Sequence, residues 1–313
     1  MSLTIIHGLE NMTRPEKGLV ATIGTFDGIH RGHKAIIEQL EKGAAKIGLP
    51  SLMITFEPHP RTLVTPDSPP LLLTCTDEKI KILEEIHDGM LLVLRFNRQL
   101  MNMTAEEFAR DILIEKLNVK KLIVGYDHAF GRNRSGTIND LMNLSRLLSF
   151  SLEVVDPVIV GGRPISSTRI RRLIEGHNLS AAIDLLGHPY PAAGTVRRGI
   201  GLGKKIGYPT ANLEYNPRKL LPKDGVYSCR VEIDERSYHG MMFIGKNHFN
   251  PDLEKSFEVN IFDFDRDIYD KEIFCYPEIY IRENRKYDDP SQLVEQLKLD
   301  KQKVLMLKNR GDS

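Results

Sequence analysis

GLVATIGTFDGIHRGH, residues 18–33, is the stretch that decides the fold of the first half of the chain. Residues 18–24 are almost uniformly apolar or glycine, which predicts a buried strand. From residue 33 to residue 47 apolar side chains recur at helical spacing, which predicts a helix. A buried strand followed at once by a helix is typical of the βαβ units that build a parallel sheet.

The same alternation continues to about residue 155. Thr104 and Glu107 form a capping box at the start of one of the predicted helices. We therefore predict a Rossmann-like α/β domain, with a parallel sheet covered by helices on both faces. Its further strands are expected at residues 51–56, 91–94, 121–125 and 152–155, and its further helices at residues 77–87, 104–117 and 138–148.

The pattern changes after about residue 187. GHPYP, residues 187–191, is a stiff, helix-breaking stretch of the kind that joins domains. Short strand-like runs with turn signals then recur, which predicts an antiparallel barrel or sandwich with a terminal helix at residues 293–307. We predict two domains, residues 1–186 and 187–313. The strands of the second are expected at residues 192–196, 226–233, 238–244, 257–264 and 272–281.

Length and composition fit this division and exclude several classes of protein. A chain of 313 residues holds about two typical domains. Its 43 basic and 42 acidic residues nearly cancel, which argues against binding nucleic acid through bulk charge. Three widely spaced cysteines form neither a disulfide framework nor a CxxC zinc site. Without an apolar run of about 20 residues or a signal peptide, we expect a cytoplasmic protein with no membrane partner. The composition indicates no oligomeric state.

Two histidines, His30 and His33, follow the first predicted strand. In an open α/β sheet, ligands bind at the carboxyl ends of strands, and the N-terminus of the next helix favours anions. A packed and a solvated histidine are one alternative. Zinc is another, although HxxH lacks the i,i+4 spacing and no third ligand is evident. The third alternative is two hydrogen-bond donors to a nucleoside triphosphate, in a turn that contributes Gly24, Phe26, Asp27, Gly28 and Gly32.

A second segment of the first domain, ISSTRIR at residues 165–171, places arginines in the first turn of a short predicted helix. Cations are normally unfavourable at a helix N-terminus, but a bound polyphosphate would reverse that. A solvated basic helix start is the alternative. FEPHP at residues 56–60 and VGYDHAFG at residues 124–131 follow other strands and bring rings to the same sheet edge. The predicted phosphate ligands are Ser166, Ser167, Thr168, Arg169 and Arg171.

The second domain contains GIGLGKKIGYPTANL at residues 199–213, which is neither a Walker A loop nor a dinucleotide fingerprint. A flexible glycine hairpin before a strand is the alternative. Thr210 and Asn212 are two positions apart, so they share one face of a strand, and two neutral oxygens beside a triphosphate suit Mg²⁺. Glycine amides and nearby cations are expected to hold phosphates. The predicted nucleotide ligands are Gly201, Gly203, Lys204, Gly207, Pro209, Thr210 and Asn212, with Arg197, Arg198 and Lys205 nearby.

These motifs resemble those of a known family. TFDGIHRGH and ISSTRIR resemble signatures of the nucleotidylyltransferase superfamily, and GYPTANL at residues 207–213 resembles the riboflavin kinase signature. With DGVYS at residues 224–228 and FEVNIFDF at residues 257–264, their order resembles the bifunctional bacterial riboflavin kinase/FAD synthetase family. The resemblance covers nearly the whole chain.

The resemblance implies two activities that use ATP as co-substrate. In the second domain riboflavin is phosphorylated to FMN with Mg²⁺, held by Thr210 and Asn212, and Glu258 is the general base. In the first domain FMN is adenylylated to FAD, with His30, His33 and Arg169 as catalytic residues. Asp127 is implied as a further nucleotide contact. Glu258 rests on the family alone, because by itself it is a polar residue alternating with apolar ones on a strand.

The chain departs from the family pattern at Asp127-His128, at residues 244–250 and at Asp270, so the flavin-loop contacts are expected to differ. One rival interpretation is a nucleotidylyltransferase for another phosphorylated substrate, with a β domain that binds a flavin or other ligand without catalysis. Another is a flavin-binding protein without turnover, whose histidines or Glu258 would be expected to differ. A nucleic-acid-binding barrel is disfavoured by the neutral charge and the lack of tryptophan.

Overall fold

The computed structural model describes residues 3–128, 130–132, 136–199, 202–246, 255–287 and 289–311. The chain divides into two compact units. The first consists of Met1–Leu71 and Lys79–Ser167, and the second of Leu72–Glu78 and Thr168–Ser313. The predicted boundary between the two functional domains, after residue 186, remains a prediction.

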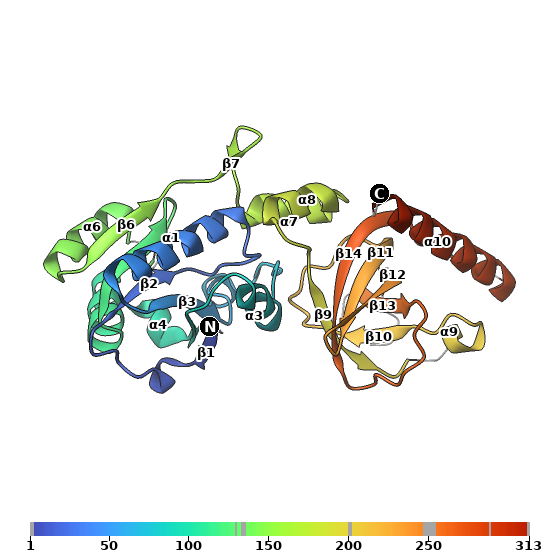
Figure 1. Cartoon of the computed structure of the whole chain (residues 1–313), viewed down its shortest axis with the longest axis horizontal. Helices are drawn as coiled ribbons and strands as arrows, with labels where there is room; N and C mark the ends of the chain where they lie inside the picture. The colour runs from blue at the N-terminus through green and yellow to red at the C-terminus, as the bar shows by residue number, and fades with distance from the viewer. Residues whose placement is uncertain are drawn as a thin grey trace. The chain divides into compact units, whose positions relative to one another are not determined.

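The first unit is built on a six-stranded sheet in which every neighbouring pair is parallel (Figure 1). This confirms the predicted α/β class. β1 was not predicted, because its four residues form a short, half-exposed strand at the sheet edge. In spatial order the strands are β1 (Thr4–His7), β4 (Met90–Arg95), β3 (Ser51–Glu57), β2 (Leu19–Ile23), β5 (Val119–Gly125) and β6 (Ser151–Val155).

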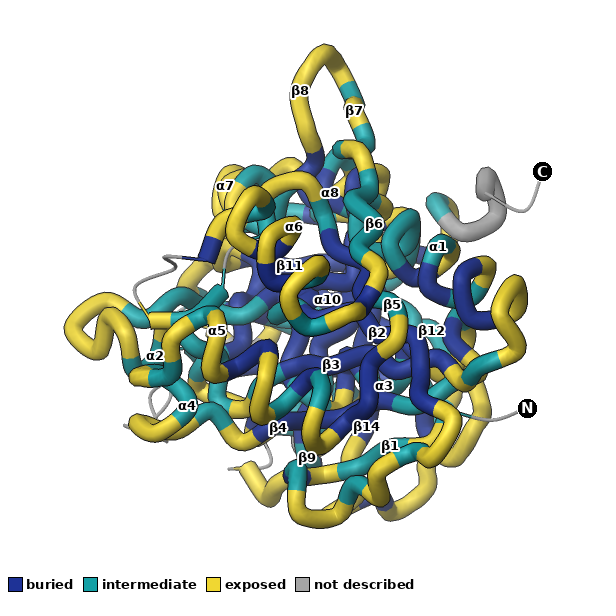
Figure 2. The backbone as a smooth tube through the Cα atoms, turned by 90° about the vertical axis from the view of Figure 1, so that its left-hand side faces the viewer, coloured by how far each residue is buried: buried dark blue, intermediate teal, exposed yellow. Residues whose placement is uncertain are grey.

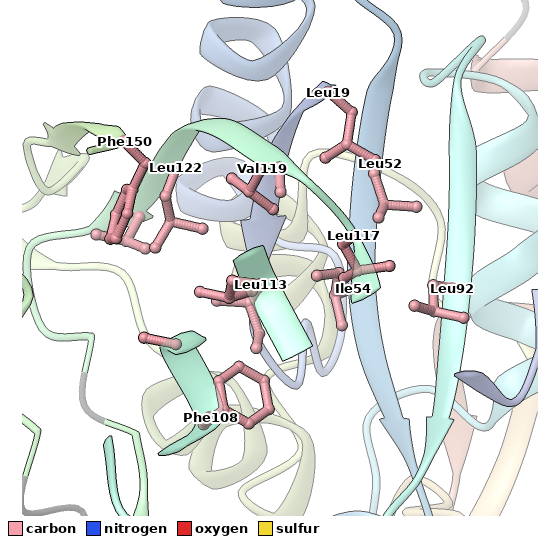
Figure 3. Close-up of a cluster of buried hydrophobic side chains, with 14 of the residues drawn as sticks. Leu19, Leu52, Ile54, Leu92, Phe108, Leu113, Leu117, Val119, Leu122 and Phe150 are labelled. Atoms are coloured by element: carbon pink, nitrogen blue, oxygen red, sulfur yellow. The ribbon is translucent and has the colours of Figure 1, made fainter. Parts of the chain in front are cut away.

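Both faces of this sheet are buried. All of β2 is buried, and its side chains alternate between two hydrophobic clusters. Leu19 packs with Phe108 and Leu113 on one face (Figure 3), and Val20 packs with Leu40 of α1 on the other. The sheet is therefore a covered central layer, so the ends of its strands are where polar side chains can gather.

The helices of the first unit start largely where the sequence predicts. Thr104 Oγ1 accepts from the Glu107 amide at 3.1 Å, and the Thr104 amide donates to Glu107 Oε2 at 2.8 Å, which confirms the capping box. After one turn that helix continues as a π-helix. The elements are η1 (Leu9–Asn11), α1 (Arg31–Ile47), α2 (Arg61–Val64), α3 (Thr76–Glu84), α4 (Arg98–Asn102), α5 (Ala105–Glu107), the π-helix Phe108–Lys116 and α6 (Ile138–Leu147).

A short hairpin leaves this unit between the sheet and the next helix. It consists of β7 (Ile159–Val160) and β8 (Arg163–Pro164), and Figure 2 shows it exposed along most of its length. None of the helices among the described residues combines the length and the apolar character needed to cross a bilayer.

The second unit is a closed six-stranded barrel in which every neighbouring pair is antiparallel, so the barrel alternative is confirmed over the sandwich. One predicted strand ends three residues early, at Ile261, because the chain turns at Asp263 with φ +52°. Around the barrel the strands are β10 (Ala211–Glu214), β13 (Lys255–Ile261), β12 (Arg236–Lys246), β11 (Gly225–Ile233), β14 (Glu272–Arg282) and β9 (Ala192–Arg197).

Four helices accompany the barrel within the described part of the second unit. The long terminal helix packs on the barrel through Leu297 and Val304, as part of a cluster with Val226 and Ile281. It extends beyond the predicted residues 293–307 at both ends. The helices are α7 (Ser167–Glu175), α8 (Leu179–Leu186), α9 (Leu202–Lys205) and α10 (Pro290–Gly311).

A buried ion pair fixes the short segment Leu72–Glu78 to the barrel unit. Glu78 Oε2 lies 2.8 Å from Lys219 Nζ, and both side chains are only 1% exposed. Glu78 Oε1 accepts from the Ala193 amide at 2.8 Å, and Lys219 Nζ donates to Leu73 O at 2.6 Å. This segment comes from the first half of the sequence, where the helix predicted at residues 77–87 does not indicate a pairing with the barrel.

Candidate active sites

The turn after β2 is strained and held by packing. Phe26 and Ile29 have φ of +46° and +40°, a left-handed conformation that is unfavourable for residues with bulky side chains. Gly28 between them has φ +87°, which glycine adopts freely. Phe26 and Ile29 are buried in the cluster beneath the sheet face, and Asp27 is buried as well. Strain retained by packing at the end of a sheet strand is a feature of ligand sites.

The structure brings His30 and His33 together at the start of α1. His30 is the N-cap, and its Nδ1 accepts from the His33 amide at 3.3 Å. The two rings stack with centroids 3.6 Å apart, and the Phe26 and His33 rings make a T-shaped contact with centroids 5.3 Å apart. Because Nδ1 of His30 accepts a hydrogen bond, its neutral ring carries the proton on Nε2, which is then a donor.

The His33 ring is kept neutral. Burial lowers the pKa of His33 well below its ordinary value, and the charges of His30 and Lys79 lower it further. His33 Nδ1 is buried and has no hydrogen-bond partner among the described residues. A buried polar atom without a partner is costly unless a ligand or water meets it. His33 therefore provides a neutral, pre-oriented polar group rather than a fixed positive charge.

Lys79 is a buried lysine at this site that sequence reasoning missed. Its Nζ donates to Thr25 O at 2.8 Å and to Thr55 Oγ1 at 3.0 Å. The pattern of residues 77–87 predicts a helix but no role for Lys79. However, Lys79 shares a helix face with Ile82 and Leu83, at spacings of three and four residues. That spacing was the available signal, because it places Lys79 on the helix face that carries Ile82 and Leu83, and both of these side chains are buried.

Ser167 is the member of the ISSTRIR motif that lies at the histidine turn. Its hydroxyl donates to Asp27 O at 2.9 Å, and both residues belong to the first unit. From Thr168 onward the chain belongs to the second unit, where Thr168 is exposed and Arg169 and Arg171 are partly exposed. The remaining predicted ligands lie as follows: Gly24 after β2, Gly32 in the first turn of α1, Ser166 just before α7, and Asp127 exposed after β5.

In the barrel, Asn212 of β10 and Thr210, the residue just before β10, come together with Glu258 of β13. Asn212 of β10 is the register partner of Glu258 in β13. The Thr210 hydroxyl donates to Glu258 Oε2 at 3.2 Å. Asn260 Nδ2 donates to Pro209 O at 2.7 Å, which ties the start of β10 to β13. Two oxygen-bearing side chains, Asn212 of β10 and Thr210 just before it, therefore lie beside a carboxylate of β13.

Burial makes Glu258 more basic than an ordinary glutamate. It raises the pKa of the Glu258 carboxyl, and the hydrogen bond from Thr210 opposes that rise. A carboxylate with a raised pKa is a better proton acceptor. The structure thus gives a physical reason to single out Glu258, which the sequence pattern alone did not.

The barrel oxygens fit a hard cation that shares its coordination with phosphates. Among the described residues, no group of three or more His, Cys, Asp or Glu side chains is placed to hold a metal ion. Thr210 donates its only hydroxyl hydrogen to Glu258, so the lone pairs of the Thr210 oxygen remain available to a cation. Mg²⁺ takes few protein ligands and keeps waters or phosphate oxygens for the rest. The donor set of Thr210 and Asn212 is consistent with that chemistry.

A side chain at Gly199 would displace the amide of Asn212. A Cβ on Gly199 would lie 2.3 Å from Asn212 Nδ2, which is far inside van der Waals contact. The loop beyond it is partly helical, since Gly203 and the exposed Lys204 lie in α9, and Gly207 follows with φ +82°. The predicted ligand Gly201 lies outside the described residues.

The cations flanking this loop are already engaged by other side chains. Arg197 Nε lies 2.7 Å from Glu214 Oε2, and its Nη1 lies 2.5 Å from Asp270 Oδ1. The Arg198 guanidinium lies over the Tyr269 ring, 4.8 Å from its centroid. The departure from the family pattern at Asp270 therefore supplies an ion-pair partner for Arg197. Residues 247–250, the other barrel departure, lie outside the described residues.

Comparison with known proteins divides the chain in the same way. Residues 12–169 match the FAD synthetase family, and residues 186–307 match the riboflavin kinase family. A bifunctional riboflavin kinase/FMN adenylyltransferase from Escherichia coli K12 is 34% identical over 300 residues, covering 95% of this chain and 96% of that protein. Its counterpart from Pseudomonas fluorescens is 35% identical over 286 residues, covering 91% of each chain.

A solved structure from Streptococcus pneumoniae has the same fold. It is called a macrolide-efflux protein, superposes with a TM-score of 0.82 and is 37% identical, covering 96% of this chain and 98% of that one.

Proposed function

Since the chain belongs to the bifunctional riboflavin kinase/FMN adenylyltransferase family, we propose that it converts riboflavin to FMN and then FMN to FAD, using one ATP in each step. In the first step the 5′-hydroxyl oxygen of riboflavin attacks the γ-phosphorus, ADP leaves and the hydroxyl proton passes to a base. In the second step a phosphate oxygen of FMN attacks the α-phosphorus of ATP and pyrophosphate leaves. The efflux activity in the name of the streptococcal protein is not assigned to this chain.

Glu258 carries the kinase proposal. It lies beside Thr210 and opposite Asn212, and burial raises the pKa of its carboxyl. We assign it as the general base that takes the proton from the attacking hydroxyl. Thr210 and Asn212 would hold Mg²⁺, which when bound neutralises phosphate charge in phosphoryl transfer. Gly203, Lys204, Gly207 and Pro209 would shape the loop over the phosphates.

The histidine pair carries the adenylyl-transfer proposal. The attacking group is already an anion, so this step needs no base. It needs groups that stabilise charge as it builds on the α-phosphate, and hydrogen-bond donors oriented in advance do this effectively. We assign that role to His30 and His33. Ser166, Ser167, Thr168, Arg169 and Arg171 would hold the departing pyrophosphate.

One assay tests both steps. The full chain is incubated with riboflavin, ATP and Mg²⁺, and the flavins are separated by chromatography. We expect FMN to appear first and FAD to follow, and FMN as the starting flavin should give FAD and pyrophosphate. A folded preparation that leaves riboflavin unconverted at saturating ATP and Mg²⁺ would contradict the kinase assignment. Adenylylation of a different phosphorylated substrate would then identify a nucleotidylyltransferase with a non-catalytic barrel.

We also assign the reaction to the cytoplasm. The three cysteines of the protein, Cys75, Cys229 and Cys275, are buried and free. Burial raises the pKa of the Cys229 thiol well above its ordinary value. Free thiols fit a reducing compartment, which is also where ATP is plentiful. Fractionation of the source cells, followed by the flavin assay on each fraction, tests this assignment.

A further inference from the structure

A lysine outside every motif reaches the turn that carries the histidines. Lys79 in α3 is only 6% exposed. Its Nζ donates to Thr25 O and to Thr55 Oγ1, and the Thr55 hydroxyl itself donates to Thr25 O at 3.2 Å. The carbonyl of Thr25 is therefore met by two donors from different elements. Burying an ammonium group is costly, so a burial of this kind needs a compensating role.

The carbonyl that Lys79 holds lies at the start of the strained turn. Thr25 immediately precedes Phe26, whose φ is +46°, and the turn then passes through Ile29 to the N-cap His30. The Phe26 and His33 rings are in T-shaped contact. A shift of the Thr25 peptide would therefore be passed directly to the residues that set the orientation of both histidines.

We infer that Lys79 is a positioning residue for adenylyl transfer: its ammonium group fixes the Thr25 carbonyl, and thereby the turn that presents His30 and His33. This inference rests on the proposed function of the histidine pair. Lys79 acts through the turn, because its Nζ donates to Thr25 O and to Thr55 Oγ1. A displacement of catalytic groups by about 1 Å can lower the reaction rate by up to about 100-fold.

The charge of Lys79 has a second effect at the same place. The titratable groups that act on the His33 ring are His30, at the N-cap of α1, and Lys79, from α3. Both lower the pKa of His33, in addition to burial. Removing the ammonium group should therefore raise the pKa of His33, which a purely space-filling lysine would not do.

The test uses Lys79→Met in the full chain, because methionine keeps much of the side-chain volume and removes the charge. Steady-state kinetics are measured for FAD formation from FMN and, on the same preparation, for FMN formation from riboflavin. We expect kcat for FAD formation to fall by about 10- to 100-fold, with both KM values within about twofold and FMN formation unchanged. Lys79→Arg should recover part of the loss. The matched control is Lys42→Met, an exposed lysine on α1, which should change neither activity.

The outcomes separate this inference from the proposed function. A wild-type protein that makes no FAD would contradict the proposed function itself. A wild-type protein that makes FAD, with Lys79→Met equally fast, would overturn only the role of Lys79. A higher KM for ATP at unchanged kcat would make Lys79 a substrate contact and would also overturn the inference.

A second variant and a spectroscopic readout keep the test decisive if Lys79→Met does not fold. Thr55→Val removes the hydroxyl that links Lys79 to Thr25 O, and it should lower kcat for FAD formation several-fold without affecting FMN formation. In histidine-labelled Lys79→Arg and Thr55→Val proteins, an NMR titration should place the His33 pKa close to the wild-type value, because both keep a cation at position 79. An unchanged kcat in Thr55→Val would count against the inference.

Discussion

The histidine turn and the barrel strands use the same physical effect for opposite purposes. Burial is the largest cause of the pKa shift at both places, and each time it favours the uncharged form. In His33 that outcome supplies a neutral polar group, which suits a reaction whose nucleophile is already an anion. In Glu258 it strengthens a base, which suits a nucleophile that must lose a proton. Desolvation by itself specifies neither chemistry; the group that is buried decides it.

The backbone differs as much as the chemistry. The histidines lie on a turn with two non-glycine residues at positive φ, held by packing and by Lys79. The barrel group lies on regular paired strands, where Asn212 and Glu258 are register partners. Strained turns transmit small changes in packing, whereas paired strands resist them. Substitutions that remove one chemistry should therefore leave the other intact, and this independence can be tested.

Glu258→Gln should have the largest effect. Glutamine keeps the shape of the side chain and an oxygen that accepts from Thr210, but it cannot take up a proton at neutral pH. We expect FMN formation to fall by about 10²- to 10⁴-fold, and FAD formation from FMN to stay at the wild-type rate. Glu235→Gln, at an exposed turn of the same unit, is the control. Equal damage to both activities would refute the separation of the two sites.

His33→Ala is the reciprocal experiment. Loss of one transition-state donor typically costs about 10²- to 10³-fold in kcat, so FAD formation should nearly vanish while FMN accumulates from riboflavin. The exposed His7 of β1 provides a matched control, since His7→Ala should leave both rates unchanged. Substantial FAD production by a folded His33→Ala protein would show that the histidine pair does not serve this reaction.

Gly199→Ala should produce a smaller and more selective effect. The new Cβ would collide with Asn212, so the amide must move away from the position it holds beside Glu258. We expect KM for ATP in the kinase reaction to rise by about tenfold, the order of a 1.4 kcal/mol loss in binding, with FAD formation from FMN unaffected. An unchanged KM would show that Asn212 does not contact the nucleotide or its cation.

The smallest expected effect is on stability. The folded-state pKa of Glu258 is raised above that of the unfolded chain. Its contribution to stability is therefore fully present below the unfolded pKa and is lost as the pH rises through the folded pKa. Glutamine has no such loss, so Glu258→Gln should melt at a higher temperature than wild type at pH 8, by up to about 4 °C. The difference should shrink toward pH 4, as thermal scans at both pH values can show; a lower Tm at pH 8 would contradict it.

Much of this comparison could be predicted from local sequence. Apolar runs located the covered strands, and helical spacing located the helices. Thr210 and Asn212 were predicted on one face of a strand; β10 includes Asn212, and Thr210 lies one residue before it. These features depend on neighbours in the chain. β1 was missed because a four-residue, half-exposed edge strand has too few apolar positions to form a pattern.

What the sequence did not reveal depends on contacts between distant segments. Glu258 alternates with apolar residues like any polar strand residue, and only its pairing with β10 brings it to Thr210. Lys79 belongs to a predicted helix whose pattern does not identify its partners, and only packing brings its ammonium group to Thr25 O. The same holds for Arg197, whose nearby carboxylates lie 17 and 73 positions away in the chain. Periodicity indicates which face a side chain takes, but not what it meets there.

The pairing of Glu78 with Lys219 has a consequence for dissecting this enzyme. A fragment that starts at residue 187 would contain every barrel strand and yet lack Leu72–Glu78, so Lys219 would keep its dry surroundings and lose its counter-charge. Breaking a buried pair from one side typically costs about 3–5 kcal/mol. A kinase half cut out by gene truncation should thus be fragile, and adding the seven missing residues back as a synthetic peptide should restore much of its robustness.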